Sequence, residues 1–477
     1  MEKLPITIIL PLLVGIIAGV QGQADPWDQV PIILARISEP TFPDVTFNIL
    51  EYGAIPAPNL NDVEAPFSVV DANTNAFRNA IGLANIFGVW ACHRDSVNGS
   101  FFTSGPITIR SNVNVHLATR ESIVRFTRNT TAYPLVFTRW EGIELINYSP
   151  FVYAFEEENI ALTAVGLLDG NCDCEHWWPW KGTWYAQCWE TTPINQTIDR
   201  DALFQMAEDD VPVVDRVFGE GHYLRPQFIQ PYRSKNVLIQ GITITNSPMW
   251  IVHPVLCDNV VVRDVNITSL GPNSDGVDPE SCKDVWIYNV TFNNGDDDIA
   301  IKSGRNADGR RVNVSSENIV IQDCSMEEGH GGVTLGSCIS GGVKKVFAER
   351  IYLSSDMLDT AIRGGLLEGF YLRDITVGRV GRQVIEVDFF YEEGPNAGFV
   401  PVIKDFVIQN LTLLEFAPYT CYIRGYEGHP NASFVGLRLE NATFNGVAND
   451  PHYVVENVDV VELENVVVNG AVWEWGK

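Results

Sequence analysis

The chain has 477 residues, of which 45% are hydrophobic and 19% are charged, and this balance excludes wholesale disorder. Its formal net charge of −28 argues against nucleic acid and against an anionic membrane surface as partners. A polyanion would bind such a protein only in a locally basic cleft, or at an acidic pH that neutralises part of the charge.

Residues 1–24 have the pattern of a secretory signal peptide. Lys3 precedes an apolar run from Ile6 to Val20, and small residues around Gly22 and Ala24 offer a cleavage site. This run is shorter than the roughly 20 residues that a membrane-spanning helix needs, and no later segment is long and apolar enough. We therefore expect a secreted, extracellular protein in which residues 25–477 form one domain; an uncleaved anchor is the alternative.

Two further features fit secretion. Nine cysteines favour disulfides with one thiol left over, and the Cys172-Asp173-Cys174 spacing is a poor zinc pattern. We expect no metal and no cofactor. Some of the Asn-x-Ser/Thr patterns should carry glycans, and these patterns begin at Asn98, Asn129, Asn147, Asn195, Asn266, Asn289, Asn313, Asn410, Asn431 and Asn441.

The first half of the chain predicts short strands around one helix. Residues 47–54 read as a strand that ends in a turn, and residues 101–109 and 113–117 read as two more. Between them, residues 73–84 carry apolar side chains at helical spacing, which predicts a short N-terminal helix that caps the core.

Residues 166–217 break this pattern and read as an insertion rich in tryptophan and cysteine. The crowded indoles allow two interpretations: a loop stabilised by aromatic packing, or a wall on which sugar rings stack. The tryptophans concerned are Trp177, Trp178, Trp180, Trp184 and Trp189.

A repeat of 23 to 36 residues follows, and it predicts the fold. Each copy holds two short runs that alternate β-branched residues, which excludes a helical solenoid, and a leucine-rich repeat frame is absent. The chain is therefore predicted to be all-β: a single-stranded right-handed parallel β-helix. The copies begin at Asn236, Asn259, Asp284, Asn318, Lys345, Gly369 and Asp405, with a weaker one near Asn457. Asparagine suits the left-handed backbone that coil corners require.

Carboxylates recur at the period of the coils. Asp275 and Asp296 are 21 residues apart, so we expect them at similar positions on adjacent coils, facing one groove. His330 and Arg363 follow one and two coils further along. Such a group suits glycosidic bond hydrolysis, in which one carboxyl donates a proton and another activates water. Inversion would need the two carboxyls about 6.5–9.5 Å apart.

Four ordered motifs resemble the polygalacturonases of glycoside hydrolase family 28: Asn273-Ser274-Asp275-Gly276, Gly295-Asp296-Asp297, Gly329-His330-Gly331 and an arginine near 363. The resemblance covers most of the chain after the signal peptide. Leu224-Arg225-Pro226-Gln227, Asn246-Ser247-Pro248-Met249-Trp250 and Tyr391-Glu392-Glu393-Gly394 are more similar to the exo-acting branch.

The resemblance implies roles for individual residues and a monomeric enzyme that acts on pectin, an acidic polysaccharide. Asp296 would be the general acid, and Asp275 and Asp297 would activate water. Asn273 would orient Asp275, and His330 would tune the acid or form a hydrogen bond with it. Arg363 would bind a sugar carboxylate, with Lys302 as a second carboxylate partner or as a solvated loop charge.

Three positions depart from the family pattern. Ser274 stands where threonine is usual, and Asp298 replaces a cysteine, which leaves Cys324 unpaired or paired elsewhere. Arg363-Gly364-Gly365 lacks the lysine of the family's Arg-x-Lys pair, which puts the uronic substrate in question.

We predict an acidic pH optimum, because the protein is acidic and the substrate is a polyanion. A basic patch would aid binding, and it would be formed by His222, Arg225, Lys302, Arg305, Arg310, Arg311, His330 and Arg363.

Three other functions stay open. A calcium-dependent lyase would use Asp296-Asp297-Asp298 as ligands. A non-catalytic carbohydrate-binding β-helix would tolerate the missing lysine. A related hydrolase would cleave rhamnogalacturonan or xylogalacturonan.

Overall fold

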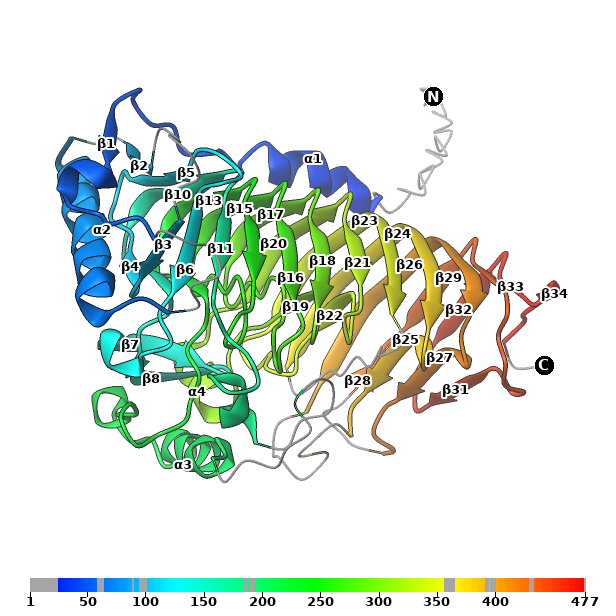
Figure 1. Ribbon diagram of the computed structural model, residues 1–477. Coiled ribbons are helices and arrows are strands. Elements are labelled where there is room, and N and C mark those ends of the chain that lie inside the picture. The colour runs from blue at the N-terminus through cyan, green and yellow to red at the C-terminus, as the bar shows by residue number, and fades with distance from the viewer. Residues whose placement is uncertain are drawn as a thin grey trace, which may run out of the picture.

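The computed structural model describes residues 25–57, 64–87, 90–93, 101–182, 188, 194–355, 365–390, 394, 400–428 and 433–475. The predicted signal peptide lies outside these residues, and so does Arg363. Coils of parallel strands stack in one direction from helix α2 (Phe67–Phe87) to the C-terminal strands (Figure 1). This is the predicted right-handed parallel β-helix.

Two ladders of parallel strands form the largest sheet. The first ladder contains β1 (Thr46–Asn48), β2 (Trp90–His93), β5 (Asn114–Leu117), β10 (Glu158–Ala164), β13 (Lys235–Gln240), β15 (Asp258–Arg263), β17 (Lys283–Tyr288), β20 (Ser316–Gln322), β23 (Val343–Ser355), β24 (Leu366–Val380), β26 (Val402–Phe416), β29 (Leu437–Glu440) and β32 (Val461–Glu464). The second contains β3 (Phe101–Ser104), β6 (Ile123–Phe126), β11 (Leu167–Asp169), β14 (Thr243–Thr245), β16 (Asn266–Ser269), β18 (Thr291–Asn294) and β21 (Ser325–Glu327), and β23, β24 and β26 extend into it. Strands β30 (Thr443–Phe444) and β33 (Val467–Val468) continue the second ladder at the C-terminal end, where β34 (Ala471–Val472) pairs with β33 in antiparallel fashion. Strand β28 (Ser433–Phe434) pairs with the start of β26 in the first ladder.

The register of the first ladder confirms the repeat residue by residue. The second residue of each predicted copy pairs with its equivalent on the next coil, through Val237, Val260, Val285, Ile319, Val346, Phe370 and Phe406. All seven side chains are buried. Each buried side chain of this size contributes about 1.5–3 kcal/mol, so stacking stabilises every coil through its neighbours.

The first residue of each copy turns the corner of the coil. The seven predicted corner residues have φ between 54° and 83°, in the left-handed region. Asparagine tolerates this conformation, and its side chain also bonds to the next coil. The amide of Asn259 donates to Asn236 at 2.7 Å, and that of Asn236 donates to Asn159 at 2.8 Å. These asparagines therefore form a ladder of their own.

The N-terminal part caps the helix but differs from the prediction at its first strand. Helix α2 includes the predicted helix 73–84 and is longer at both ends, and it buries Phe77 and Ile81 in the core. Strand β1 ends at Asn48, because the Asn48 side chain accepts a hydrogen bond from the Leu50 amide and starts the 3-10 helix η2 (Ile49–Tyr52). The predicted strand over 49–54 is thus wrong. Before it, η1 (Pro26–Asp28) and α1 (Gln29–Leu34) pack along the coils.

A lateral layer lies beside the coils in the lower left of Figure 1. It contains the antiparallel hairpin of β7 (Leu135–Trp140) and β8 (Ile143–Tyr148), α3 (Thr197–Glu208) and α4 (Asn306–Val312). Three short helices lie in the chain next to these elements: η3 (Thr130–Ala132) precedes β7, η4 (Trp178–Lys181) precedes α3, and η5 (Val213–Asp215) follows α3. Leu203 of α3 packs against Trp140 and Leu145 of the hairpin. Helix α3 was not predicted, and β11 pairs with β6 and β14, so the first residues of segment 166–217 belong to a coil.

The remaining strands form shorter parallel sheets. One ladder runs through β4 (Ile107–Thr108), β9 (Val152–Phe155) and β12 (Ile229–Tyr232) and continues by single bridges to β19 (Ile299–Ile301) and β22 (Val333–Leu335). We call this ladder the pocket sheet. Another sheet contains β25 (Gln383–Asp388), β27 (Tyr419–Arg424) and β31 (Tyr453–Glu456).

Most of the described cysteines are buried thiols and are not in disulfides. Cys174 and Cys188 form a disulfide, whereas six others are free: Cys172, Cys257, Cys282, Cys324, Cys338 and Cys421. The prediction that disulfides dominate is wrong for these six, because each side chain fills an interior position as a small apolar group. Cys324 is unpaired, one of the two outcomes expected from Asp298. None of the described helices is long and apolar enough to cross a membrane.

Candidate active site

The predicted acids lie on turns that lead into the pocket sheet. Val277 pairs with Ile299, and Ile299 pairs with Val333, on three successive coils. The site motifs directly precede these three residues. Each turn is tied to the next by backbone hydrogen bonds: the Val277 amide donates to Asp298, and the Asp298 amide donates to Gly331. The β-helix therefore fixes the spacing between the acids.

The register corrects the predicted stacking by one residue. With Val277 opposite Ile299, Asp275 lies opposite Asp297 and not opposite Asp296. Asp296 lies instead opposite His330 on the following coil. The reason is that the coil spans 22 residues between paired positions, one more than the 21 that separate Asp275 from Asp296.

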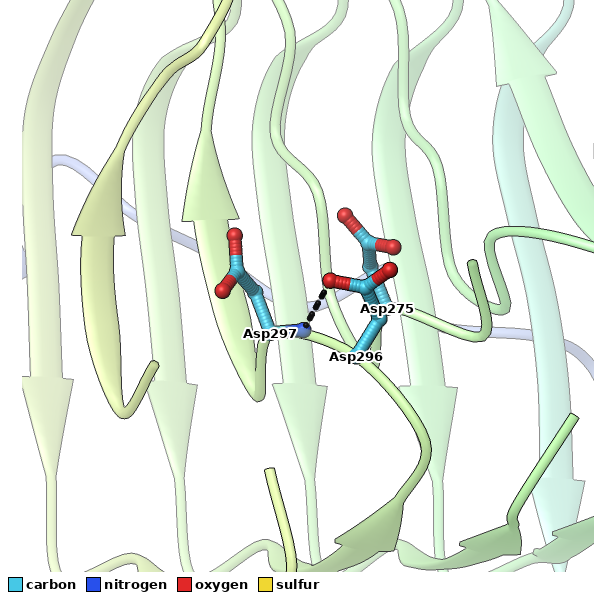
Figure 2. A group of neighbouring side chains, drawn as sticks. All are labelled: Asp275, Asp296 and Asp297. Atoms are coloured by element: carbon cyan, nitrogen blue, oxygen red, sulfur yellow. Dashed lines mark hydrogen bonds between the residues drawn. The ribbon is translucent and has the colours of Figure 1, made fainter. Parts of the chain in front are cut away.

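The three aspartates form a compact group, which we call the acid trio. One oxygen from each of Asp275, Asp296 and Asp297 lies within 4.8 Å of the other two. Figure 2 shows the three carboxylates side by side, with the Asp297 amide donating to Asp296 Oδ1 at 3.0 Å. The nearest oxygens of the three carboxyls are therefore close enough for their ionisation to be coupled.

Two cations partly neutralise the acid trio. Lys302 is buried, and its Nζ lies 3.2 Å from Asp275 Oδ2 and 3.7 Å from Asp278 Oδ2. The same ammonium lies 4.3 Å from the centre of the Trp250 ring. On the other side, His330 Nδ1 lies 3.3 Å from Asp296 Oδ1. The interpretation of Lys302 as a solvated loop charge is wrong.

Asn273 contacts a different acid from the one predicted. Its amide donates to Asp296 Oδ2 at 3.2 Å, whereas the resemblance implied Asp275 as its partner. Its carbonyl accepts from Arg225 Nη2 at 2.7 Å, and that guanidinium also donates to the carbonyls of Pro248 and Pro272. Arg225 is fully buried, so it holds Asn273 from beneath and does not contribute to an exposed basic patch.

Burial and mutual repulsion separate the pKa values of the trio. Burial, and then the charge of Asp296, raise the pKa of Asp275 to about 7 and that of Asp297 well above its usual value. Burial opposes ionisation of Asp296 as well, but the hydrogen bond and charge of His330 outweigh it and lower the Asp296 pKa. Although burial disfavours the His330 cation, Asp296 raises the His330 pKa to about 9. The free site therefore combines ionised and protonated carboxyls.

The structure revises the predicted basic patch. Lys302 and His330 line the pocket over the trio, together with two cations that the sequence did not single out, Lys181 and Arg200. Among the other predicted members, His222 pairs with Asp199, Arg311 pairs with Glu144, and Arg225 and Arg305 are buried. Arg310 does not line this pocket, and Arg363 lies outside the described residues. The wall is completed by Glu141, Trp250, Ser337 and Cys338. Lys181 and Arg200 come from the insertion, where no repeat or motif marked them.

The described tryptophans of the insertion support aromatic packing. Trp177 and Trp178 are buried, and the Trp177 ring lies 4.8 Å from Trp180 and 5.5 Å from Tyr133. The Trp178 indole donates to the carbonyl of Ser247 at 2.8 Å, which fixes the insertion to a coil. Trp184 and Trp189 lie outside the described residues.

The acid trio is close enough to hold a cation, since hard metals prefer carboxylate oxygens. The set predicted for a calcium lyase is different, however. Asp298 is buried under the next turn, and a Cβ at Gly329 would lie 2.4 Å from Asp298 Oδ2. The three consecutive aspartates therefore do not face one ion together.

Neighbouring carboxyls with separated pKa values in one pocket are the groups that glycosidic bond hydrolysis requires. Residues 219–356 match the family described as glycosyl hydrolases family 28. The crystal structure of a hyperthermoactive exopolygalacturonase from Thermotoga maritima is 37% identical, with a TM-score of 0.84 over 94% of this chain and 97% of that chain. The protein belongs to glycosyl hydrolases family 28.

Curated relatives agree with this assignment. A "Probable polygalacturonase" from Vitis vinifera is 30% identical over 234 residues, which are 47% of this chain and 47% of that protein. An exo-poly-α-D-galacturonosidase from Dickeya chrysanthemi is 22% identical over 372 residues, which are 72% of this chain and 59% of that protein. The chain spans about half the length of the curated relatives it matches.

Proposed function

We propose that the protein hydrolyses the α-1,4-galacturonosidic bonds of pectin and polygalacturonate. The observation that carries this proposal is the acid trio, held by His330 and Lys302 in a pocket that also presents Lys181 and Arg200. The carboxyls supply acid and base, and the cations offset the charge of a uronic substrate. The relatives named as polygalacturonases support the same substrate.

In the proposed reaction, Asp296 protonates the departing glycosidic oxygen, and Asp275 and Asp297 activate water. The electrostatics of the free site favour the opposite distribution, with Asp296 ionised and Asp297 protonated. Because the oxygens lie within 4.8 Å of one another, a proton can pass to Asp296 as the substrate binds. Asn273 and His330 hold the acid in place.

An acidic pH optimum follows from the same charges. Below a pH of about 7, Asp275 is protonated and the trio carries one negative charge. Once the Asp297 proton has passed to Asp296, this charge rests on Asp297, which accepts the proton of the water that Asp275 orients by a hydrogen bond. Above that pH, a second negative charge repels the sugar carboxylates and weakens binding. A maximum of kcat/KM above neutral pH would contradict this proposal.

We propose exo action with inversion at the anomeric carbon. Exo action is supported by the exopolygalacturonase from Thermotoga maritima and by the insertion, which adds η4 and α3 to the pocket wall. Inversion is supported by the family resemblance. Proton NMR of the first product identifies its anomer: inversion gives β-galacturonate, and initial α-product overturns this part of the proposal.

We further propose that the enzyme is secreted and acts as a monomer on extracellular polysaccharide. The leader pattern of residues 1–24 and the Asn-x-Ser/Thr patterns support secretion. Expression with the leader, followed by N-terminal sequencing of the protein in the medium, tests it. Size-exclusion chromatography with light scattering tests the monomer.

The main experiment is chromatography of polygalacturonate digests. Exo action gives a monomer or another single short product, endo action gives a ladder, and release from rhamnogalacturonan or xylogalacturonan alone would redefine the substrate. Asp296→Asn should lower kcat by about 10²–10⁴-fold, whereas Asp258→Asn, the same change at an exposed position of β15, should not. Unchanged activity in Asp296→Asn would indicate that the trio is not catalytic. Formation of a product that absorbs ultraviolet light, and the loss of this activity when calcium is chelated, would indicate a calcium lyase.

A further inference from the structure

The insertion holds one lysine over the acid trio in a fixed position. Lys181 is the last residue of η4, and it lines the same pocket as Asp275 and Asp296. It lies outside residues 219–356, the part of the chain that matches the family. Its place in the pocket is therefore specific to the insertion and does not follow from the family motifs.

Several contacts fix the backbone at Lys181. The amide of Gly182 donates to the carbonyl of Pro179 at 3.0 Å, and the amide of Gln196 donates to the carbonyl of Trp180 at 2.7 Å. The Cys174–Cys188 disulfide closes a loop of sequence around η4. Such a position can present a side chain to a ligand without a large cost in ordering.

Lys181 differs from the other cations of the pocket in its partners. The Lys302 ammonium contacts Asp275, and Arg200 forms an ion pair with Glu141 at 2.8 Å. By contrast, no carboxylate among the described residues lies within ion-pair distance of the Lys181 ammonium. Burial lowers the Lys181 pKa, although Glu141 and Asp296 oppose that shift. A half-buried ammonium without a paired carboxylate is suited to bind an anion that enters the pocket.

We propose that Lys181, beside the anchored Arg200, binds the carboxylate of the terminal sugar of a galacturonate chain. The inference rests on the proposed function and names the group that recognises the chain end. The Arg200 guanidinium is held by Glu141 and lies 4.4 Å from the centre of the Phe204 ring, so it flanks the site as a rigid neighbour. Lys181 thus adds specificity for an acidic terminal sugar, apart from the reacting carboxyls.

Trigalacturonates that carry a single methyl ester test the proposal. The wild-type enzyme should prefer the unesterified trimer over the trimer esterified at the pocket-bound end by roughly 10- to 100-fold in kcat/KM, the value of one charge-assisted hydrogen bond. Lys181→Met should lose this preference, and Lys181→Arg should retain most of it. An ester at the other end should affect both enzymes equally. Lys404→Met, at an exposed position of β26, is the matched control for the lost charge.

The outcomes distinguish the inference from the proposed function. If wild type and Lys181→Met discriminate equally between the two trimers, Lys181 does not bind the terminal carboxylate, and the hydrolase proposal stands. If wild type cleaves no galacturonate oligomer, the proposed function fails and the inference fails with it. Selective loss of discrimination in Lys181→Met, with a melting temperature close to that of wild type, supports the inference.

Discussion

Lys302→Met removes the cation that contacts Asp275, the most deeply buried carboxyl of the acid trio. Its Nζ lies 3.2 Å from Asp275 Oδ2, and methionine keeps the length of the side chain beside Trp250. The ammonium favours the ionised form of Asp275 and partly offsets the burial that raises the Asp275 pKa to about 7. Loss of the ammonium should therefore raise this pKa further.

The distance sets the size of the shift. Two unit charges 3.2 Å apart interact by about 5 kcal/mol at an effective dielectric constant of about 20. Water in the open pocket screens this energy, and half of it corresponds to about 2 pH units at 1.36 kcal/mol per unit. Because a higher Asp275 pKa delays the second negative charge, the alkaline limb of kcat/KM should move to higher pH by about 2 units, while its maximum falls.

Initial rates of sugar release from trigalacturonate between pH 3 and about pH 10 measure this limb. Lys302→Arg should keep the limb close to that of wild type, because the charge remains. Lys283→Met removes a lysine whose side chain is 51% exposed, and it should leave the limb in place. An unmoved limb in Lys302→Met, or a shift to lower pH, would refute the electrostatic coupling between Lys302 and Asp275.

Three other changes probe the surroundings of the trio. Asn273→Ala removes a hydrogen bond to Asp296 and should lower kcat by about 10- to 150-fold, with little change in melting temperature; a kcat close to that of wild type would contradict this role. His330→Gln removes the cation that lowers the Asp296 pKa, so the acid limb of the kcat/KM profile should move to higher pH by about one unit. An acid limb at the wild-type pH would contradict the electrostatic coupling of His330 to Asp296. Burial raises the Asp298 pKa well above its usual value, so the folded protein binds this proton more tightly than the unfolded chain. Above a pH of about 4, the unfolding free energy of wild type should thus fall by about 1.4 kcal/mol per pH unit relative to that of Asp298→Asn, as measured by urea titration. A difference between the two proteins that does not change with pH would show that Asp298 is not protonated in the fold.

The prediction from sequence was most accurate where structure repeats. The corner position of each copy, such as Asn236 and Asn259, was assigned correctly because a parallel β-helix stacks equivalent residues. At the acids, the predicted alignment of neighbouring coils is wrong by one residue, because Asp275 stacks on Asp297 and not on Asp296. A turn of variable length separates the strands there, and only the hydrogen-bond register determines its alignment.

Side-chain roles that depend on burial were harder to predict. A lysine in a turn is usually solvated, yet Lys302 is buried because Asp275 and Asp278 surround it. Arg225 was expected in an exposed patch, but it lies beneath the site, bonded to Asn273. In both residues the charged group bonds to residues of other coils, which no local pattern of sequence reveals.

The sequence by itself determined the β-helix, its period and the presence of acids on neighbouring coils, because these follow from interactions between equivalent residues of successive repeats. The tertiary structure alone decided how the pocket is closed. Lys181 and Arg200 reach the acid trio through an insertion whose position depends on contacts with distant coils, including the bond from Trp178 to Ser247. Such contacts join segments that share no repeat, so their geometry appears only once the chain is folded.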